Sequence, residues 1–196
     1  RAAGAIVYGD ALMLLHNQTK PYEATPGDSQ KIVDKWTEIL TRQLNKGDGC
    51  SKKDIAANLN RIVADFSAVE VRRVPKVKIY VKYASLGNND LEGFLASQDC
   101  EVNLPGILAF ALFKIDNRLE DIKLYGGSAV KFAVVHRLMR YCTELEMILI
   151  DAVKKAPQYV PPSSYSHTKS LVKGVIGYGD KMGEGWLLTA EMLELA

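Results

Sequence analysis

The segment GYGDKMGEGW, near the end of the chain, has a composition that could support ligand chemistry. It contains Gly177, Gly179, Gly183 and Gly185 and continues directly into an apolar stretch typical of a helix. Glycines let a backbone approach a ligand closely, and a helix N-terminus offers free N–H groups, so a phosphate, carboxylate or thioester oxygen could bind there. The spacing, GxGxxxGxG, matches neither the dinucleotide fingerprint nor the lysine-containing phosphate loop, so a tight connection is the alternative interpretation.

This segment supplies the first candidate site residues. Gly183, Gly185 and Trp186 are candidate ligand-binding residues. Glu184, directly before the expected helix, is a candidate general base, and a helix cap is its alternative role.

Two further turns could bind a ligand. Asn88 and Asn89 follow the expected strand 76–83, at the kind of strand end where open α/β sheets place ligand crevices. Their amides could bind a substrate amide or carboxylate, although asparagine is also common in turns and caps. The turn 125–128 could cradle an anion through Ser128, for which a cap is the default role.

The sequence predicts no metal site. The cysteines are far apart, form no CxxC pair and have no histidine at ligand spacing, so buried or incidental thiols are the expected state of Cys50, Cys100 and Cys142, with convergence on a metal as the alternative. Their odd number argues against a disulfide framework and favours a reduced, cytoplasmic setting.

Charged side chains occur in two segments of interest. The mixed run at 116–123 is typical of a solvated face. Farther along the chain, Lys131, His136, Arg137 and Arg140 share one expected helix and could bind an anionic ligand, with surface solvation as the alternative.

The elements that must position these residues follow from periodicity. Apolar spacing predicts helices over 5–16 and 29–45, and Ser51 with Asp54 predicts a capped helix up to Phe66. A strand over 76–83, a helix over 90–98 and a strand over 100–105 form a parallel crossover unit. Later helices are expected from Ile107, over 129–155, over 168–175 and near Trp186.

The expected fold class is therefore α/β and helix-rich. A small parallel sheet, Rossmann-like but incomplete, is flanked by helices. We expect an N-terminal helical segment over 1–74 and an α/β segment over 75–196.

Composition excludes several classes of protein. The 196 residues include 25 Lys and Arg against 23 Asp and Glu, a net charge of +2 that argues against a dedicated nucleic-acid binder. The longest strongly apolar run, 104–113, is about half of what a membrane-spanning helix needs, so no membrane segment is expected. The chain begins at Arg1 and ends within a helical pattern, which indicates a piece of a longer protein.

Three segments are more informative together than separately: VKIYVKYASLGNNDLEGFLASQDCEV, DNRLEDIKLYGGSAVK and VKGVIGYGDKMGEGWLLTAEMLEL. Together they resemble the dehydratase-like region of the 2-hydroxyacyl-CoA (2-hydroxyglutaryl-CoA) dehydratase activases, also called CoA-substrate-specific enzyme activases. The resemblance covers nearly the whole chain, and GEGWLLTAEM is its most specific part.

The resemblance implies a much longer cytoplasmic protein of anaerobic metabolism. Its ATP-binding modules would drive low-potential electron transfer, and its dehydratase-like part would help to form a cleft for a [4Fe-4S] or related cluster and an acyl-CoA. The chain itself shows no ATPase motif, and the family's cysteine segment would follow Ala196. This piece alone is therefore expected to hold neither cluster nor ATP and to be inactive, whereas the intact protein would be an iron–sulfur redox enzyme or a dehydratase activator.

Two alternatives remain, and the first also depends on the resemblance. The chain could be a non-catalytic docking or scaffold module between activase and dehydratase, with the rest of its own chain and a dehydratase component as partners. An α/β enzyme acting alone is less well supported, because no nucleophile, acid pair or metal set can be assembled from the sequence.

Overall fold

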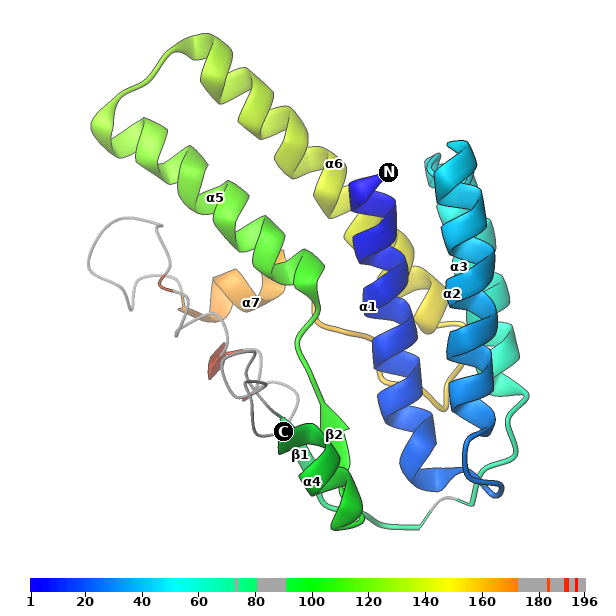
Figure 1. Ribbon diagram of the computed structural model, residues 1–196. Coiled ribbons are helices and arrows are strands. Elements are labelled where there is room, and N and C mark those ends of the chain that lie inside the picture. The colour runs from blue at the N-terminus through cyan, green and yellow to red at the C-terminus, as the bar shows by residue number, and fades with distance from the viewer. Residues whose placement is uncertain (73, 81–90, 173–182, 184–188, 191–192, 194–196) are drawn as a thin grey trace.

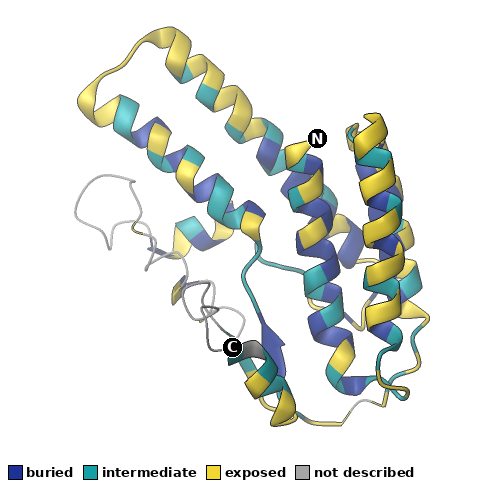
Figure 2. Ribbon diagram, in the orientation of Figure 1, coloured by how far each residue is buried: buried dark blue, intermediate teal, exposed yellow. Residues whose placement is uncertain are grey.

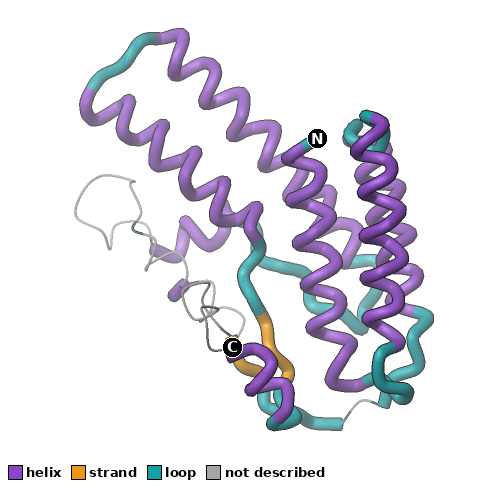
Figure 3. The backbone as a smooth tube through the Cα atoms, in the orientation of Figure 1, coloured by secondary structure: helices purple, strands orange, loops and turns teal. Residues whose placement is uncertain are grey.

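The computed structural model describes residues 1–72, 74–80, 91–172, 183, 189–190 and 193. The architecture is helix-rich with a small two-stranded parallel sheet, which confirms the predicted class at that level (Figure 1, Figure 3). The expected turn 85–89 and the expected helix near Trp186 lie outside the described residues.

The first helix, α1 (Ala2–Thr19), lies in the middle of the molecule. It packs against α2 (Asp28–Lys46) and α3 (Lys52–Ser67) on one side and against α5 (Ile107–Tyr125) on the other (Figure 1). Its buried side chains therefore point in several directions rather than along one stripe. The helix passes into the short 3-10 helix η1 (Lys20–Tyr22), where Pro21 lacks the N–H that a continuing helix needs.

Helices α2 and α3 form an antiparallel pair with the ends that the sequence predicts. Gly47 ends α2 in the left-handed conformation (φ 88°), and its N–H donates to the carbonyls of Gln43 and Leu44. Ser51 caps α3 by accepting the N–H of Asp54 at 3.1 Å, as the capping pattern predicts.

The sheet consists of β1 (Lys78–Tyr80) and β2 (Glu101–Asn103), joined through α4 (Leu91–Ser97). The strands are parallel, with Ile79 opposite Val102, so the predicted crossover unit is confirmed. Strand β1 begins two residues later than predicted, and residues 81–83 of its predicted range lie outside the described residues; β2 is shorter than the predicted range 100–105.

The second half of the chain adds a long helical hairpin. Helix α5 and helix α6 (Ala129–Val153) pack along each other, and α7 (Tyr165–Val172) packs against α5. The two helices extend beyond α1, α2 and α3 at the end where they connect (Figure 1).

One apolar core joins the two expected segments. It includes Trp36 and Phe66 from the N-terminal segment and Leu112, Leu145 and Val153 from the second segment. Burial is continuous around α1 and decreases toward the connected ends of α5 and α6 (Figure 2). No helix in the described ranges has the combination of length and apolar character needed to cross a bilayer.

Candidate functional site

A pocket lies between the second half of α1, the two strands and the start of α5. Its volume is about 60 Å³, which is room for a few water molecules or one small polar group. It is lined by the first and last residues of both strands, Lys78 and Tyr80 of β1 and Glu101 and Asn103 of β2, so it lies over one face of the sheet. Leu104 and Gly106 extend it past the carboxyl end of β2, the side on which α/β sheets commonly bind ligands. Its lining is mainly apolar but includes these polar residues: Asp10, Gln18, Lys78, Glu101, Asn103 and Glu146.

Asp10 of α1 caps α5 across the fold. Its Oδ1 accepts the N–H of Ile107 and its Oδ2 accepts the N–H of Leu108, both at 2.8 Å. These N–H groups have no partner within the helix, and the positive end of the helix dipole attracts the carboxylate. Burial nevertheless raises the pKa of Asp10 to about 6, and the two hydrogen bonds only partly offset this effect.

Gly106 makes this contact possible. A Cβ at Gly106 would lie 2.8 Å from Asp10 Oδ2 and 3.1 Å from its Cγ. The backbone of Gly106 is extended (φ −71°, ψ 145°), so it is the space beside Asp10 that requires glycine here.

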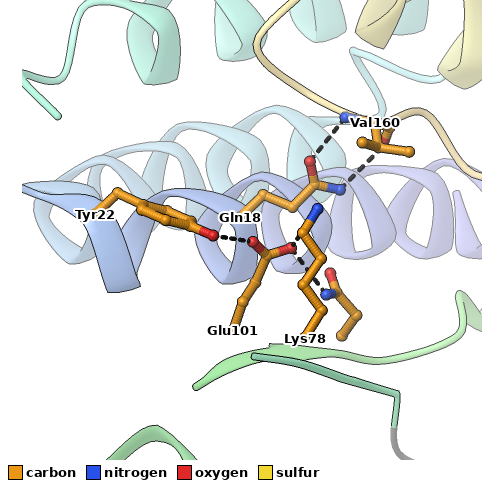
Figure 4. A network of polar contacts seen from close by, with 6 residues as sticks. Gln18, Tyr22, Lys78, Glu101 and Val160 are labelled. Carbon is orange, nitrogen blue, oxygen red and sulfur yellow. Dashed lines mark hydrogen bonds and ion pairs between the residues drawn. The ribbon is translucent and has the colours of Figure 1, made fainter. Parts of the chain in front are cut away.

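Glu101 of β2 is buried but fully partnered. Its Oε2 accepts the Tyr22 hydroxyl at 2.6 Å, its Oε1 accepts the Asn103 amide at 3.0 Å, and Lys78 Nζ lies 3.7 Å from Oε1 (Figure 4). Burial raises the pKa of the Tyr80 phenol, and the negative charge of Glu101 adds to this effect. Glu101 therefore joins the sheet to η1, the 3-10 helix that follows α1.

Gln18 joins α1 to the chain after α6. Its Nε2 donates to the Val160 carbonyl at 2.9 Å and its Oε1 accepts the Val160 N–H at 2.8 Å, so one amide satisfies both backbone groups (Figure 4). This pair holds one wall of the pocket in place.

Replacing Gln18 with alanine is expected to loosen that wall. Both hydrogen bonds are lost and the Val160 N–H gains access to water, so its hydrogen exchange should accelerate by about tenfold, which corresponds to about 1.4 kcal/mol. Exchange measured by mass spectrometry on peptides covering 157–164 checks this. Gln30→Ala, at an exposed site on α2, is the control and should leave exchange in 157–164 unchanged. Equal exchange in Gln18→Ala and in the unaltered chain would contradict the claim that Gln18 holds the backbone of Val160 in place.

Glu146 of α6 is the one acid of the pocket whose hydrogen bonding is incomplete within the described residues. Its Oε1 accepts the N–H of Tyr165 at 2.8 Å, whereas its Oε2 is buried without a hydrogen-bond partner there. The side chain is only 5% exposed. Burial raises the pKa of Glu146 to about 7, so the carboxyl is about half protonated at neutral pH.

The expectation of a solvated charged face at 116–123 is wrong for two of its residues. Asp116 and Glu120 are buried, because they lie four residues apart on the inner face of α5. Asp116 Oδ2 accepts the Tyr165 hydroxyl at 2.6 Å and pairs with Lys169 Nζ at 2.7 Å. Burial and the Asp116 charge raise the pKa of Tyr165. Partners on α7 thus compensate for burying the acid.

The structure describes few of the predicted site residues. Ser128 caps α6 by accepting the N–H of Lys131 at 3.2 Å, and Gly183 is exposed. Ser128 follows the C-terminal end of α5, about 28 Å along that helix from the pocket, so the structure does not bring it to the pocket. The other predicted residues lie outside the described residues: Glu184, Gly185, Trp186, Asn88 and Asn89.

The described residues do not fit an iron–sulfur cluster. Cys50 precedes α3, Cys100 precedes β2, and Cys142 is buried within α6, where burial raises the pKa of its thiol. No group of three or more His, Cys, Asp or Glu side chains able to hold a metal occurs within the described part of the chain.

Sequence reasoning missed the acids that form the pocket. Asp10 lies in GDALMLL, Glu101 in CEVNLP and Glu146 in ELEMILI, and all three segments are otherwise mostly apolar. An acid within an apolar run is the one sequence signal that could have indicated them, because a buried carboxyl needs a specific partner.

Comparison of the chain with models of protein families, with characterised proteins and with solved structures finds no match.

Proposed function

We propose that this chain is an α/β region of an activase-related protein of the 2-hydroxyacyl-CoA dehydratase system, acting in the cytoplasm, and that its pocket holds the polar end of an acyl-CoA. The three resembling segments support the family. The single observation that carries the site is the buried Oε2 of Glu146, which has no hydrogen-bond partner among the described residues, in a pocket over the face of β1 and β2.

The sheet supports the same proposal. A parallel β1–α4–β2 crossover with a pocket that extends past the carboxyl end of β2 is compatible with part of a Rossmann-like sheet. In this proposal the remaining strands, the cluster and the ATP-binding modules belong to other parts of the protein, and a dehydratase component is a partner.

The size and polarity of the pocket define what it can hold. About 60 Å³ accommodates a carbonyl or hydroxyl group but not a whole coenzyme A, so the rest of the ligand would remain outside the pocket. Protonated Glu146 can donate a hydrogen bond to an acyl oxygen through Oε2 while Oε1 keeps the N–H of Tyr165. The role of Glu146 would be to orient the acyl group.

Calorimetry with 2-hydroxybutanoyl-CoA tests the proposal. Affinity should rise about tenfold from pH 8 to pH 6, because the protonated fraction of Glu146 rises from about one tenth to about nine tenths. Glu146→Gln should bind equally at both pH values, because its amide donates without titrating.

Two controls make the measurement specific. Glu144→Gln changes a half-exposed acid on the same helix and should keep the pH dependence of the unaltered chain. Free coenzyme A should bind weakly, with none of the pH effect that Glu146 produces. The absence of any heat with the acyl-CoA would refute the ligand-binding role and would favour the docking or scaffold alternative.

A further inference from the structure

Helix α6 contains an unbroken coiled-coil spacing along one face. The positions alternate by four and three residues, which places them in one seam that faces a partner helix. They are Val134, Leu138, Tyr141, Leu145, Ile148 and Ala152.

The second half of this seam is already covered by the chain itself. Leu145 and Ala152 are buried in the core, and α6 packs there against α3 and α1. Beside the seam, Glu144 forms an ion pair with Lys52 at the start of α3, and Lys52 Nζ lies 5.5 Å from the centre of the Tyr141 ring. The covered half thus shows both apolar packing and a flanking charge pair.

The first half of the seam has the same pattern but is exposed. Val134 is 63% exposed and Leu138 is 47% exposed, and the neighbouring Val130 is 73% exposed. This half of α6 belongs to the part of the hairpin that extends past α1 and α3 (Figure 1, Figure 2). If α3 extended beyond its first residue, Lys52, it would lie beside this half of α6. None of the described helices lies there (Figure 1).

The flanking charges on the exposed half are all positive. Arg137 lies one heptad before Glu144, at the equivalent position beside the seam. No ion pair joins Arg137, Lys131 or Arg140 to a carboxylate in the described part of the chain. The segment 129–143 contains no acid at all.

We propose that the exposed half of this seam docks an acidic amphipathic helix from another polypeptide. The partner helix lies in line with α3 and places apolar side chains against Val134 and Leu138. One of its carboxylates pairs with Arg137, in the same way that the ammonium of Lys52 pairs with Glu144. This surface is independent of the acyl-CoA pocket.

Two other occupants fit the surface less well. Two copies of the chain would bring unpaired cations of the same sign together, which opposes association. A membrane helix typically buries a wide apolar face, whereas this stripe is about 80° wide, with Lys131 and Arg137 about 60° to either side of Val134.

A displayed library of helices tests the proposal directly. Helices of about 21 residues carry apolar seam positions, with flanking positions varied among Glu, Lys and Gln, and are sorted against the whole 196-residue chain. Selected helices should be enriched in Glu. Val134→Asp should weaken their binding by about tenfold or more, and Arg137→Glu should shift the selected charge from Glu to Lys.

Leu171→Asp is the matched control. Leu171 is 49% exposed on α7, away from the seam, so this variant should bind the selected helices as the unaltered chain does. Circular dichroism confirms that each variant is folded. Helices without charge preference, or equal binding to Val134→Asp, would overturn the proposal. So would a Val134-dependent dimer in sedimentation equilibrium or Val134-dependent binding to phosphatidylserine vesicles, because each identifies another occupant.

Discussion

Gly106→Ala is expected to lower the free energy of unfolding by about 3 kcal/mol. The added methyl group would lie 2.8 Å from Asp10 Oδ2, and the carboxylate is too short and too well packed to move away without leaving its two N–H donors. The cost combines overpacking with the loss of a helix cap. Urea denaturation followed by circular dichroism measures it.

Gly9 provides the control for the general effect of replacing a glycine with alanine. A Cβ at Gly9, one residue before Asp10 in α1, would meet nothing within 4 Å. Gly9→Ala should therefore raise stability by about 0.5–1 kcal/mol through helix propensity.

A double-mutant cycle tests whether the cause is Asp10. In an Asp10→Ala background the added methyl group has space, so Gly106→Ala should cost less than about 1 kcal/mol. A cost that is the same in both backgrounds would show that the contact with Asp10 is not responsible.

Glu146→Gln is expected to stabilise the protein above neutral pH by about 3 kcal/mol. Folding raises the pKa of Glu146 from its ordinary value of 4.5 to about 7, and each pH unit in that interval changes stability by about 1.4 kcal/mol. Melting temperature at pH 8.5 should rise by roughly 6–12 °C.

The direction of the pH dependence follows from proton binding. Between pH 4.5 and about 7 the folded protein holds more protons on Glu146 than the unfolded chain does, so the stability of the unaltered protein falls as pH rises through this window. Glutamine does not titrate, so the advantage of Glu146→Gln should vanish below about pH 4.5. Asp10, with a pKa of about 6, keeps a smaller dependence of the same sign in both proteins.

Glu144→Gln is the control for charge removal on α6. It loses only a partly exposed ion pair with Lys52, so stability should change by less than about 1 kcal/mol. If Glu146→Gln gave no stabilisation at pH 8.5, Glu146 would have to be charged and well solvated in the folded protein.

The sequence predicted the elements whose signals are local. The cap at Ser51, the end of α2 at Gly47 and the long helix from Ala129 all depend on residues within one or two turns. The first strand was predicted because residues 76–83 alternate β-branched and aromatic residues with lysines, and the second because a short strand-like segment, 100–105, follows a short helical segment.

The pocket could not be predicted in the same way. Asp10 acts on N–H groups 97 and 98 residues away, and Glu146 acts on Tyr165 19 residues away. The spacing of residues within α1 or α6 does not indicate which distant backbone groups their acids will contact. Asp116 was predicted to be solvated, but it is buried. Its burial is favourable only because Tyr165 and Lys169 of α7 contact its carboxylate, and these contacts cannot be predicted from the charged segment itself.

The central position of α1 also has a consequence for synthesis on the ribosome. The helix is synthesised before the segments that complete its contacts, because Asp10 needs Ile107 and Gln18 needs Val160, which is 142 residues later. At about 5–20 residues per second, Gln18 waits roughly 7–28 s for its partner. During this interval α2 and α3 can cover one side of α1, while its opposite apolar side stays available to a chaperone.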